Sequence, residues 1–158
     1  MDVRMYYIFR LKASSFKSSG SLPSHRTVGR KLTEWVLFRE YWDSSSDLGT
    51  IASRTGITRE EVASYVQGCL GERFLTIRKR LRVEDAKHLL LSRPDMTFAE
   101  IARTTGFPDK SDFKRAFREE TGYSARIWRE SRGCRIGCRV RAIRESNRNH
   151  CHALRKSA

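Results

Sequence analysis

The stretch Ile51-Ala-Ser-Arg-Thr-Gly-Ile57 is the most informative part of the chain, because it returns fifty residues later as Ile101-Ala-Arg-Thr-Thr-Gly-Phe107. Each copy follows a residue that favours a helix start, Asp47 in the first and Thr97 in the second. Alanine at the second position lets two helices approach closely, and glycine at the sixth can adopt the positive φ that ends a helix. A short helix, a tight turn and another helix make a helix-turn-helix unit. Two such units in a basic chain predict a protein that reads DNA.

Charge is distributed unevenly along the 158 residues, whose formal net charge is +14. Residues 1–30 hold six Lys or Arg against one Asp, and residues 132–158 hold eight against one Glu. Residues 31–131 hold eighteen basic and sixteen acidic side chains. Because residues 13–30 are also rich in Ser, we expect a flexible basic arm over 1–30, a folded body over 31–131 and a disordered basic tail over 132–158. Such arms suit a polyanion, either a nucleic acid or an anionic membrane surface.

Composition also argues against several classes of protein. No apolar run approaches the roughly 18 residues that span a bilayer, and the short run Met5–Phe9 lacks the length and the cleavage site of a signal peptide. We therefore expect a cytoplasmic chain with reduced cysteines, and Cys69 as a small buried apolar residue. An enzyme needs a nucleophile beside a base, a metal cluster or a phosphate-binding loop. The four His are scattered and no Gly-rich nucleotide loop occurs, so we expect neither catalysis nor a cofactor.

Hydrophobic periodicity predicts an all-α chain, since no segment alternates apolar and polar residues as a strand would. A first helix is expected from the pattern over 31–43, with its end near Ser44–Ser46, and further helices are expected at about 47–55, 58–70, 74–92, 97–105, 110–121 and 124–131.

The expected helix over 74–92 carries two apolar stripes. Phe74, Ile77 and Leu81 fall on one stripe, and Ala86, Leu89 and Leu90 fall on another that lies roughly 130° further round at about 100° per residue. A helix with one partner has one stripe, so this helix is predicted to connect two helix-turn-helix lobes. The alternative is a helix buried more fully in a single core. The proline of Arg93-Pro94-Asp95 should end the helix in either case.

With these features in place, residues 31–131 resemble the DNA-binding domain of the AraC/XylS family of bacterial transcription regulators. The matching strings are Leu81–Leu90, Met96–Ala102, Gly106–Phe117 and Thr121–Arg129. The first half, over 47–71, is the looser match, Ala125 stands where Pro is usual, and Trp128 stands where Tyr is commoner. The resemblance implies two lobes that place their second helices in successive major-groove segments, each about 12 Å wide.

The same resemblance assigns residues to DNA contacts. Base readers in the second lobe would be Lys110, Ser111, Asp112, Lys114 and Arg115, and those in the first lobe Glu60, Ala63 and Ser64. Lys and Arg suit guanine O6 and N7, whereas alanine can only touch a thymine methyl and glutamate can only accept, for example from cytosine N4. Phosphate contacts would come from Arg59, Gln67, Arg118 and backbone N–H groups at helix starts.

Other residues on these helices have structural interpretations. Any single cation among the base readers has the alternative of being a solvated surface side chain. Arg82 is expected to pair with a neighbouring acid rather than to contact DNA. Core positions are expected at Ile77, Leu81, Leu89, Phe113, Phe117 and Trp128.

The C-terminal tail contains the soft metal ligands Cys134, Cys138, His150, Cys151 and His152. Zinc needs four ligands, but the first pair lacks the tight Cys-x2-Cys spacing and few apolar residues surround it. An unstructured basic tail without a metal is the favoured interpretation.

These features together predict a sequence-specific DNA-binding transcription regulator. Its partners would be double-stranded DNA and, by family resemblance, RNA polymerase, with no membrane. Many family members carry a separate sensor domain, so this chain would be either a short stand-alone regulator or the output end of a larger protein whose sensor is missing. The alternative is a basic RNA-binding or protein-adaptor module that does not read DNA sequence.

Overall fold

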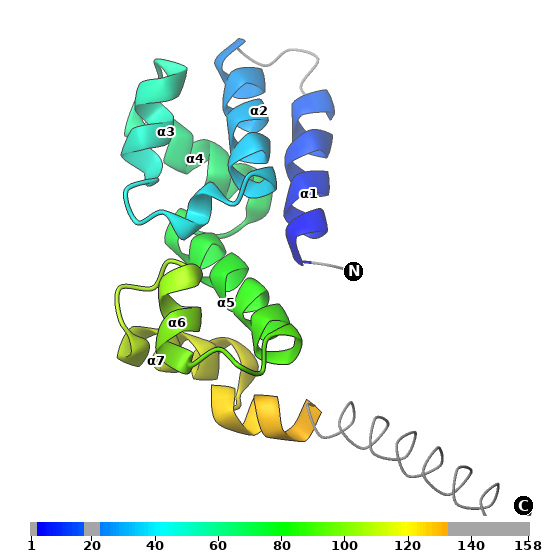
Figure 1. Cartoon of the computed structure of the whole chain (residues 1–158). Coiled ribbons are helices and arrows are strands. Elements are labelled where there is room, and N and C mark those ends of the chain that lie inside the picture. Colours follow the sequence, from blue (N-terminus) through cyan, green and yellow to red (C-terminus); the bar gives the residue numbers. More distant parts are fainter. Residues whose placement is uncertain (1–2, 18–22, 133–158) are drawn as a thin grey trace, which may run out of the picture.

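The computed structural model describes residues 3–17 and 23–132, and within these ranges the chain forms helices and no strand. The elements in order are α1 (Val3–Lys17), α2 (Pro23–Leu37), the 3-10 helix η1 (Glu40–Trp42), α3 (Leu48–Thr55), α4 (Arg59–Leu70), α5 (Phe74–Ser92), α6 (Phe98–Thr104) and α7 (Lys110–Thr121). A further helical stretch covers residues 125–132. Helices α1 to α4 form one group, α6 and α7 form another, and α5 runs from the first group into the second (Figure 1). The predicted all-α class is confirmed.

The two copies of the repeated sequence fold as two helix-turn-helix units. Asp47 caps α3 by accepting a hydrogen bond from the backbone N–H of Thr50, and Thr97 caps α6 through a capping box with Glu100. The turn that follows contains a glycine with positive φ in each copy, 68° at Gly56 and 82° at Gly106. These angles are open to glycine at little cost, which explains its place in both turns.

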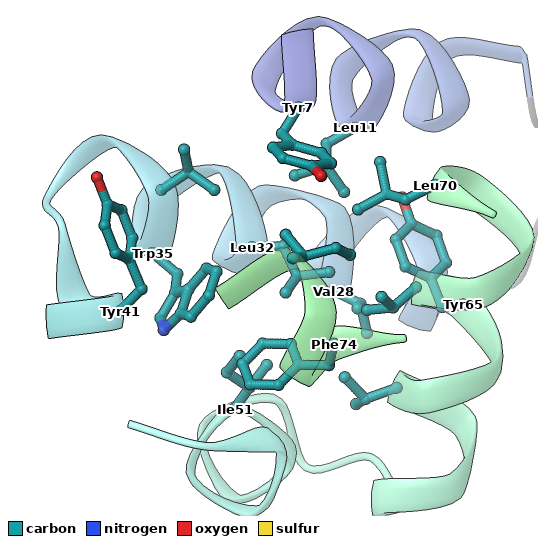
Figure 2. Packing of buried hydrophobic residues seen from close by; sticks show 14 of the residues in the cluster. Tyr7, Leu11, Val28, Leu32, Trp35, Tyr41, Ile51, Tyr65, Leu70 and Phe74 are labelled. Atoms are coloured by element: carbon teal, nitrogen blue, oxygen red, sulfur yellow. The ribbon is translucent and has the colours of Figure 1, made fainter. Parts of the chain in front are cut away.

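The first core joins helices that are far apart in the sequence. Trp35 of α2 lies between Tyr41 and Phe74, with ring centroids 5.5 Å and 4.8 Å away. Figure 2 shows Tyr7 and Leu11 of α1 covering the other side of the same cluster, and both side chains are 1% exposed. Burying a large apolar side chain contributes about 1.5–3 kcal/mol, so this cluster holds α1, α2 and α5 together.

The second core packs α6 and α7 against the C-terminal half of α5. A row of rings runs through it, with centroids 5.6 Å apart for Phe107–Phe113, 5.7 Å for Phe113–Phe117 and 5.8 Å for Phe117–Trp128. Phe113 and Phe117 are fully buried and Trp128 is partly buried against them. Ala125 is also buried, so the closing helix docks although it lacks a proline there.

The two-striped connector is confirmed. Phe74, Ile77 and Leu81 belong to the first core, whereas Ala86 and Leu90 belong to the second, with Leu89 partly buried against it. The six residues expected to be core all pack inside, with Leu89 and Trp128 only partly buried. Helix α5 therefore serves two lobes, one at each end.

The N-terminal region differs from the expected flexible arm over 1–30. Residues Val3–Lys17 and Pro23–Leu37 are helical, and Tyr7, Ile8 and Leu11 are buried in the first core. The prediction relied on the Ser-rich composition and overlooked that Tyr7 and Leu11 are spaced by about one helical turn, so that they share a face of α1. Helix α1 packs along α2 (Figure 1). Arg10 adds a hydrogen bond from its guanidinium to the backbone carbonyl of Cys69, 3.0 Å away. The tail over 133–158, including the five soft metal ligands, lies outside the described residues.

Two neighbouring predictions also need correction. The helix expected from residue 31 to near Ser44–Ser46 begins earlier, at Pro23, and ends at Leu37. Arg39, with φ 57°, separates it from η1. Proline suits the first turn of a helix because its missing N–H is not needed there. Cys69 is half-buried rather than buried, although its side chain packs against the first core.

Arg82 is structural, as predicted, but its partners are backbone carbonyls rather than an acid. Its Nε donates to the carbonyl of Tyr41 at 2.6 Å, and a second guanidinium nitrogen lies 3.4 Å from the carbonyl of Asp43. Burial lowers the pKa of Arg82 to about 10. This arginine therefore joins the connector to the segment around η1.

Candidate nucleic-acid interface

Helix α7 presents one exposed face from the second lobe. Asp109 caps the helix by accepting from the backbone N–H of Ser111 at 2.6 Å and of Asp112 at 2.8 Å. Phe113, Ala116 and Phe117 point into the core, so the remaining side of the helix faces solvent. That side carries Lys110, Ser111, Lys114, Arg115 and Arg118, all exposed, with Asp112 half-buried at its edge.

Helix α4 presents the corresponding face from the first lobe. It starts with a capping box in which Thr58 accepts from the N–H of Glu61 and Glu61 accepts from the N–H of Thr58. Val62, Tyr65, Val66 and Leu70 are buried. Arg59, Glu60, Ser64 and Gln67 are exposed and Ala63 is half-buried.

The two faces are equivalent in position but not in chemistry. Counting from the caps Thr58 and Asp109, the equivalent pairs are Arg59/Lys110, Glu60/Ser111, Ala63/Lys114, Ser64/Arg115 and Gln67/Arg118. The second lobe places a cation at four of these positions and the first lobe at one. The structure thus brings the residues assigned to each helix onto one face, and charged donors are concentrated on α7.

Asp112 and Arg115 act together. The guanidinium of Arg115 pairs with the Asp112 carboxylate one turn earlier, while 72% of the Arg115 side chain stays exposed. An exposed pair of this kind adds little to stability, about 0.3–0.5 kcal/mol, but it restricts the direction of the guanidinium. Lys110 and Lys114 form no ion pair with any described residue, so their ammonium groups remain available to a ligand.

A groove beside α4 brings further residues to the first lobe. Arg59, Ala63, Ser64 and Gln67 line it together with Arg73, Leu75 and Arg78 from the start of α5. Leu75 is 69% exposed there, and Arg78 donates to the carbonyl of Ser44 at 3.3 Å. The α5 residues were not among those predicted from the sequence, because a motif centred on α4 does not show that the next helix returns to its side.

A second groove lies beside α7. Lys110, Lys114 and Arg118 line it with Ser124, which directly precedes the closing helix over 125–132, and with Arg126 in that helix. Arg126 also pairs with Glu130, 2.8 Å away. Both grooves therefore run alongside the helix assigned to read DNA in their lobe.

Side-chain caps occupy some of the backbone N–H groups at the helix starts. Four caps already engage them, since Asp47 accepts from Thr50, Thr58 from Glu61, Thr97 from Glu100, and Asp109 from Ser111 and Asp112. These caps occupy one N–H group in each of α3, α4 and α6 and two in α7, so a phosphate would compete with a cap only at those groups, and the carboxylates of Asp47 and Asp109 would repel it. The side chains assigned to phosphate, Arg59, Gln67 and Arg118, are all exposed and suit that role better.

The described part of the chain offers no metal site and no membrane span. Residues 3–17 and 23–132 contain no group of three His, Cys, Asp or Glu side chains placed to hold a metal. Among the same residues, no helix is both long and apolar enough to cross a membrane.

Comparison with known proteins agrees with this geometry. The helix-turn-helix domain family matches residues 51–131. The arabinose operon regulatory protein of Escherichia coli K12 is 33% identical over 92 residues, which are 58% of this chain and 30% of that protein. Its Salmonella typhimurium counterpart is also 33% identical over 92 residues, or 32% of its length. The chain thus spans only about a third of the curated relatives it matches.

Solved structures show the same fold. The DNA-binding domain of AdpA, a global transcriptional factor solved with a target DNA, aligns with TM-score 0.60 at 24% identity over 73% of this chain and 96% of that one. The C-terminal domain of the response regulator AraT from Geobacillus stearothermophilus aligns with TM-score 0.59 at 23% identity over 72% and 88%. These relatives are named as regulators, which agrees with the prediction that the chain is not an enzyme. The repeated unit, the connector helix and the match over 51–131 together establish that the chain belongs to the AraC-type helix-turn-helix family.

Proposed function

We propose that this protein is a sequence-specific DNA-binding transcription regulator whose helices α4 and α7 enter two successive major-groove segments of one duplex. The observation that carries the proposal is the pair of equivalent exposed helix faces mounted on opposite ends of α5. A major groove admits one α-helix, so each lobe can fill one groove segment.

The two faces should read DNA unequally. Lys110, Lys114 and Arg115 on α7 can donate to guanine O6 and N7, and Asp112 holds the Arg115 guanidinium in place. Ser111 can donate or accept and is permissive. On α4, Ala63 can contact a thymine methyl, Ser64 can donate or accept, and Glu60 can accept from cytosine N4.

Phosphate contacts complete the interface. Arg59 and Gln67 line the groove beside α4, and Arg118 lines the groove beside α7. Contacts from such cationic and amide side chains to phosphates position a protein on DNA without reading the bases. The structurally similar DNA-binding domain of AdpA was solved in complex with a target DNA, which supports DNA as the ligand here. The same proposal includes three points that the family resemblance supports. The protein contacts RNA polymerase, it works with a sensor domain or sensor protein, and it acts in the cytoplasm.

A footprint on a selected operator tests the proposal. A binding site is first selected from a random duplex pool, and the purified chain should then protect two segments on one face, centred about one helical turn or about 34 Å apart. Lys114→Ala should weaken protection of the second segment, whereas Arg30→Ala, which removes an exposed cation of α2 outside both faces, should not. Protection of only one segment would refute the two-segment proposal.

Comparing the affinity for the selected operator with the affinity for scrambled DNA tests the adaptor alternative. A regulator should prefer its operator over scrambled DNA by about 10³-fold or more. Equal binding to both sequences would favour the basic RNA-binding or protein-adaptor module instead.

A further inference from the structure

The short helix η1 lies at the junction of the two lobes and is held by a buried carboxylate of the connector. Asp85 of α5 is 3% exposed, and its Oδ2 accepts from the hydroxyl of Tyr41 at 2.6 Å and from Nε1 of Trp42 at 2.7 Å. Arg4 and Arg39 lie 3.8 Å and 3.9 Å from the same carboxylate. Two adjacent residues of the first lobe are thus fastened to one point on α5.

That point belongs to the half of the connector that serves the second lobe. Leu81 still packs in the first core, whereas Val83 and Ala86, on either side of Asp85, pack in the second. The bond from Arg82 Nε to the carbonyl of Tyr41 fastens η1 from the preceding turn of α5. The Arg82 guanidinium also lies over the ring of Phe107, 5.8 Å from its centroid, so one side chain touches both η1 and the second helix-turn-helix unit.

The backbone of η1 also rests directly on the turn of the second unit. A Cβ atom added to Gly106 would lie 1.9 Å from the carbonyl oxygen of Trp42. The equivalent Gly56 of the first unit has no such neighbour within 4 Å. The contact is therefore specific to the junction and is not a feature of the turn itself.

A second set of inter-lobe contacts consists of ion pairs that are partly exposed to solvent. Lys79 and Arg80 of α5 pair with Glu119 and Glu120 at the end of α7, at 3.0 Å and 3.1 Å. Partly exposed ion pairs are screened by salt and contribute little on average. The buried contacts around η1 should therefore decide how the turn, and α7 that begins four residues after Gly106, is oriented relative to α4.

We infer that Tyr41, Trp42 and Asp85 are positioning residues that set the number of base pairs between the two DNA segments, an inference that rests on the proposed two-segment recognition. Adding one base pair moves the second segment by about 3.4 Å along the axis and turns it by about 35°, since B-DNA has 10–10.5 base pairs per turn. Because hydrogen bonds and a backbone contact hold the junction, the second lobe cannot shift and rotate relative to the first to match the displaced DNA segment. Weakening the junction should make affinity less dependent on the number of base pairs between the two segments, without changing which bases each lobe prefers.

The test is a spacing series on the selected operator, with one base pair added or removed between the segments. The double variant Tyr41→Phe/Trp42→Phe removes both hydrogen bonds to Asp85 and keeps an aromatic ring at each position. Ser46→Ala is the matched control, because it removes the acceptor of the buried bond from Trp35 Nε1, 3.0 Å long, within the first lobe alone. Affinity is measured for each duplex, and a random-pool selection records the base preference of each segment.

Wild-type protein and the Ser46→Ala control should lose about tenfold or more in affinity on either altered spacing, the scale of a mismatched base pair or greater. The double variant should lose about threefold or less, with its base preferences unchanged. If the double variant unfolds below the assay temperature, the single variant Trp42→Phe is used instead. Its loss of affinity on altered spacing should lie between that of the wild-type protein and that expected for the double variant.

An unchanged spacing profile in the folded variant would overturn the inference, and so would equal relaxation in the control. Wild-type protein that reads two segments but accepts every spacing would also overturn it and leave the proposed function intact. Wild-type protein without any base preference would instead contradict the proposed function.

Discussion

Replacing Gly106 by alanine should destabilise the protein more than the same change at Gly56. Both glycines have positive φ, 82° and 68°, so each substitution incurs the left-handed penalty of about 1–2 kcal/mol. At Gly106 the new Cβ would also lie 1.9 Å from the oxygen, 2.6 Å from the carbonyl carbon and 2.8 Å from the Cα of Trp42. These are backbone atoms that cannot rotate away, and overpacking of this kind costs about 1–3 kcal/mol more.

We therefore expect a loss of about 2–5 kcal/mol for Gly106→Ala against about 1–2 kcal/mol for Gly56→Ala. Urea unfolding followed by circular dichroism measures both, with equal slopes showing that the unfolded states are comparable. An equal decrease in unfolding free energy for the two variants would mean that the turn does not rest on η1 in solution, and the expected difference would be wrong.

Three further predictions concern recognition and stability. Arg115→Ala should weaken binding to the selected site by about 1–3 kcal/mol and relax one base position, whereas Ser64→Ala should change selectivity less; selection from a random pool checks both. The pKa of Glu100 is held below its ordinary value of 4.5 by hydrogen bonds from the backbone N–H and hydroxyl of Thr97. The stability it adds is therefore present at neutral pH and disappears as the pH falls through the lowered pKa, so Glu100→Gln should have a flatter melting temperature profile in acid. Deleting residues 133–158, which hold seven Lys or Arg and one Glu, should flatten the dependence of log K on log[salt] by about 0.9 for each phosphate that the tail neutralises. The ratio of operator to scrambled-DNA affinity should stay nearly constant, and an unchanged slope would contradict this role for the tail.

Local sequence was sufficient for the two helix-turn-helix units. Caps such as Thr97 and glycines such as Gly56 act within a few residues of their own position, so their effect is visible in the chain itself. The spacing of apolar residues on α5 likewise indicated two cores, because a helix repeats its faces about every 3.6 residues whatever packs against them.

The exposed faces of the candidate interface were predictable for the same reason. Once Thr58 and Asp109 fix where α4 and α7 begin, helical geometry decides which side chains share a face with the buried ones and which do not. Arg73 was not predicted, because it reaches the α4 groove from the start of the next helix, across a turn whose direction depends on the packing of Phe74.

Helix α1 and the junction at η1 were decided by tertiary structure. Tyr7 packs in one core with residues of α2 and α5, and the stability of α1 comes from that burial, since isolated short helices are marginal in water. Asp85 accepts from side chains 43 and 44 residues earlier, and Gly106 meets the backbone of Trp42. Residue order alone specified most of the helices and the faces they expose. How the two lobes are held together emerged only in the folded chain, because those contacts join residues that no local periodicity relates.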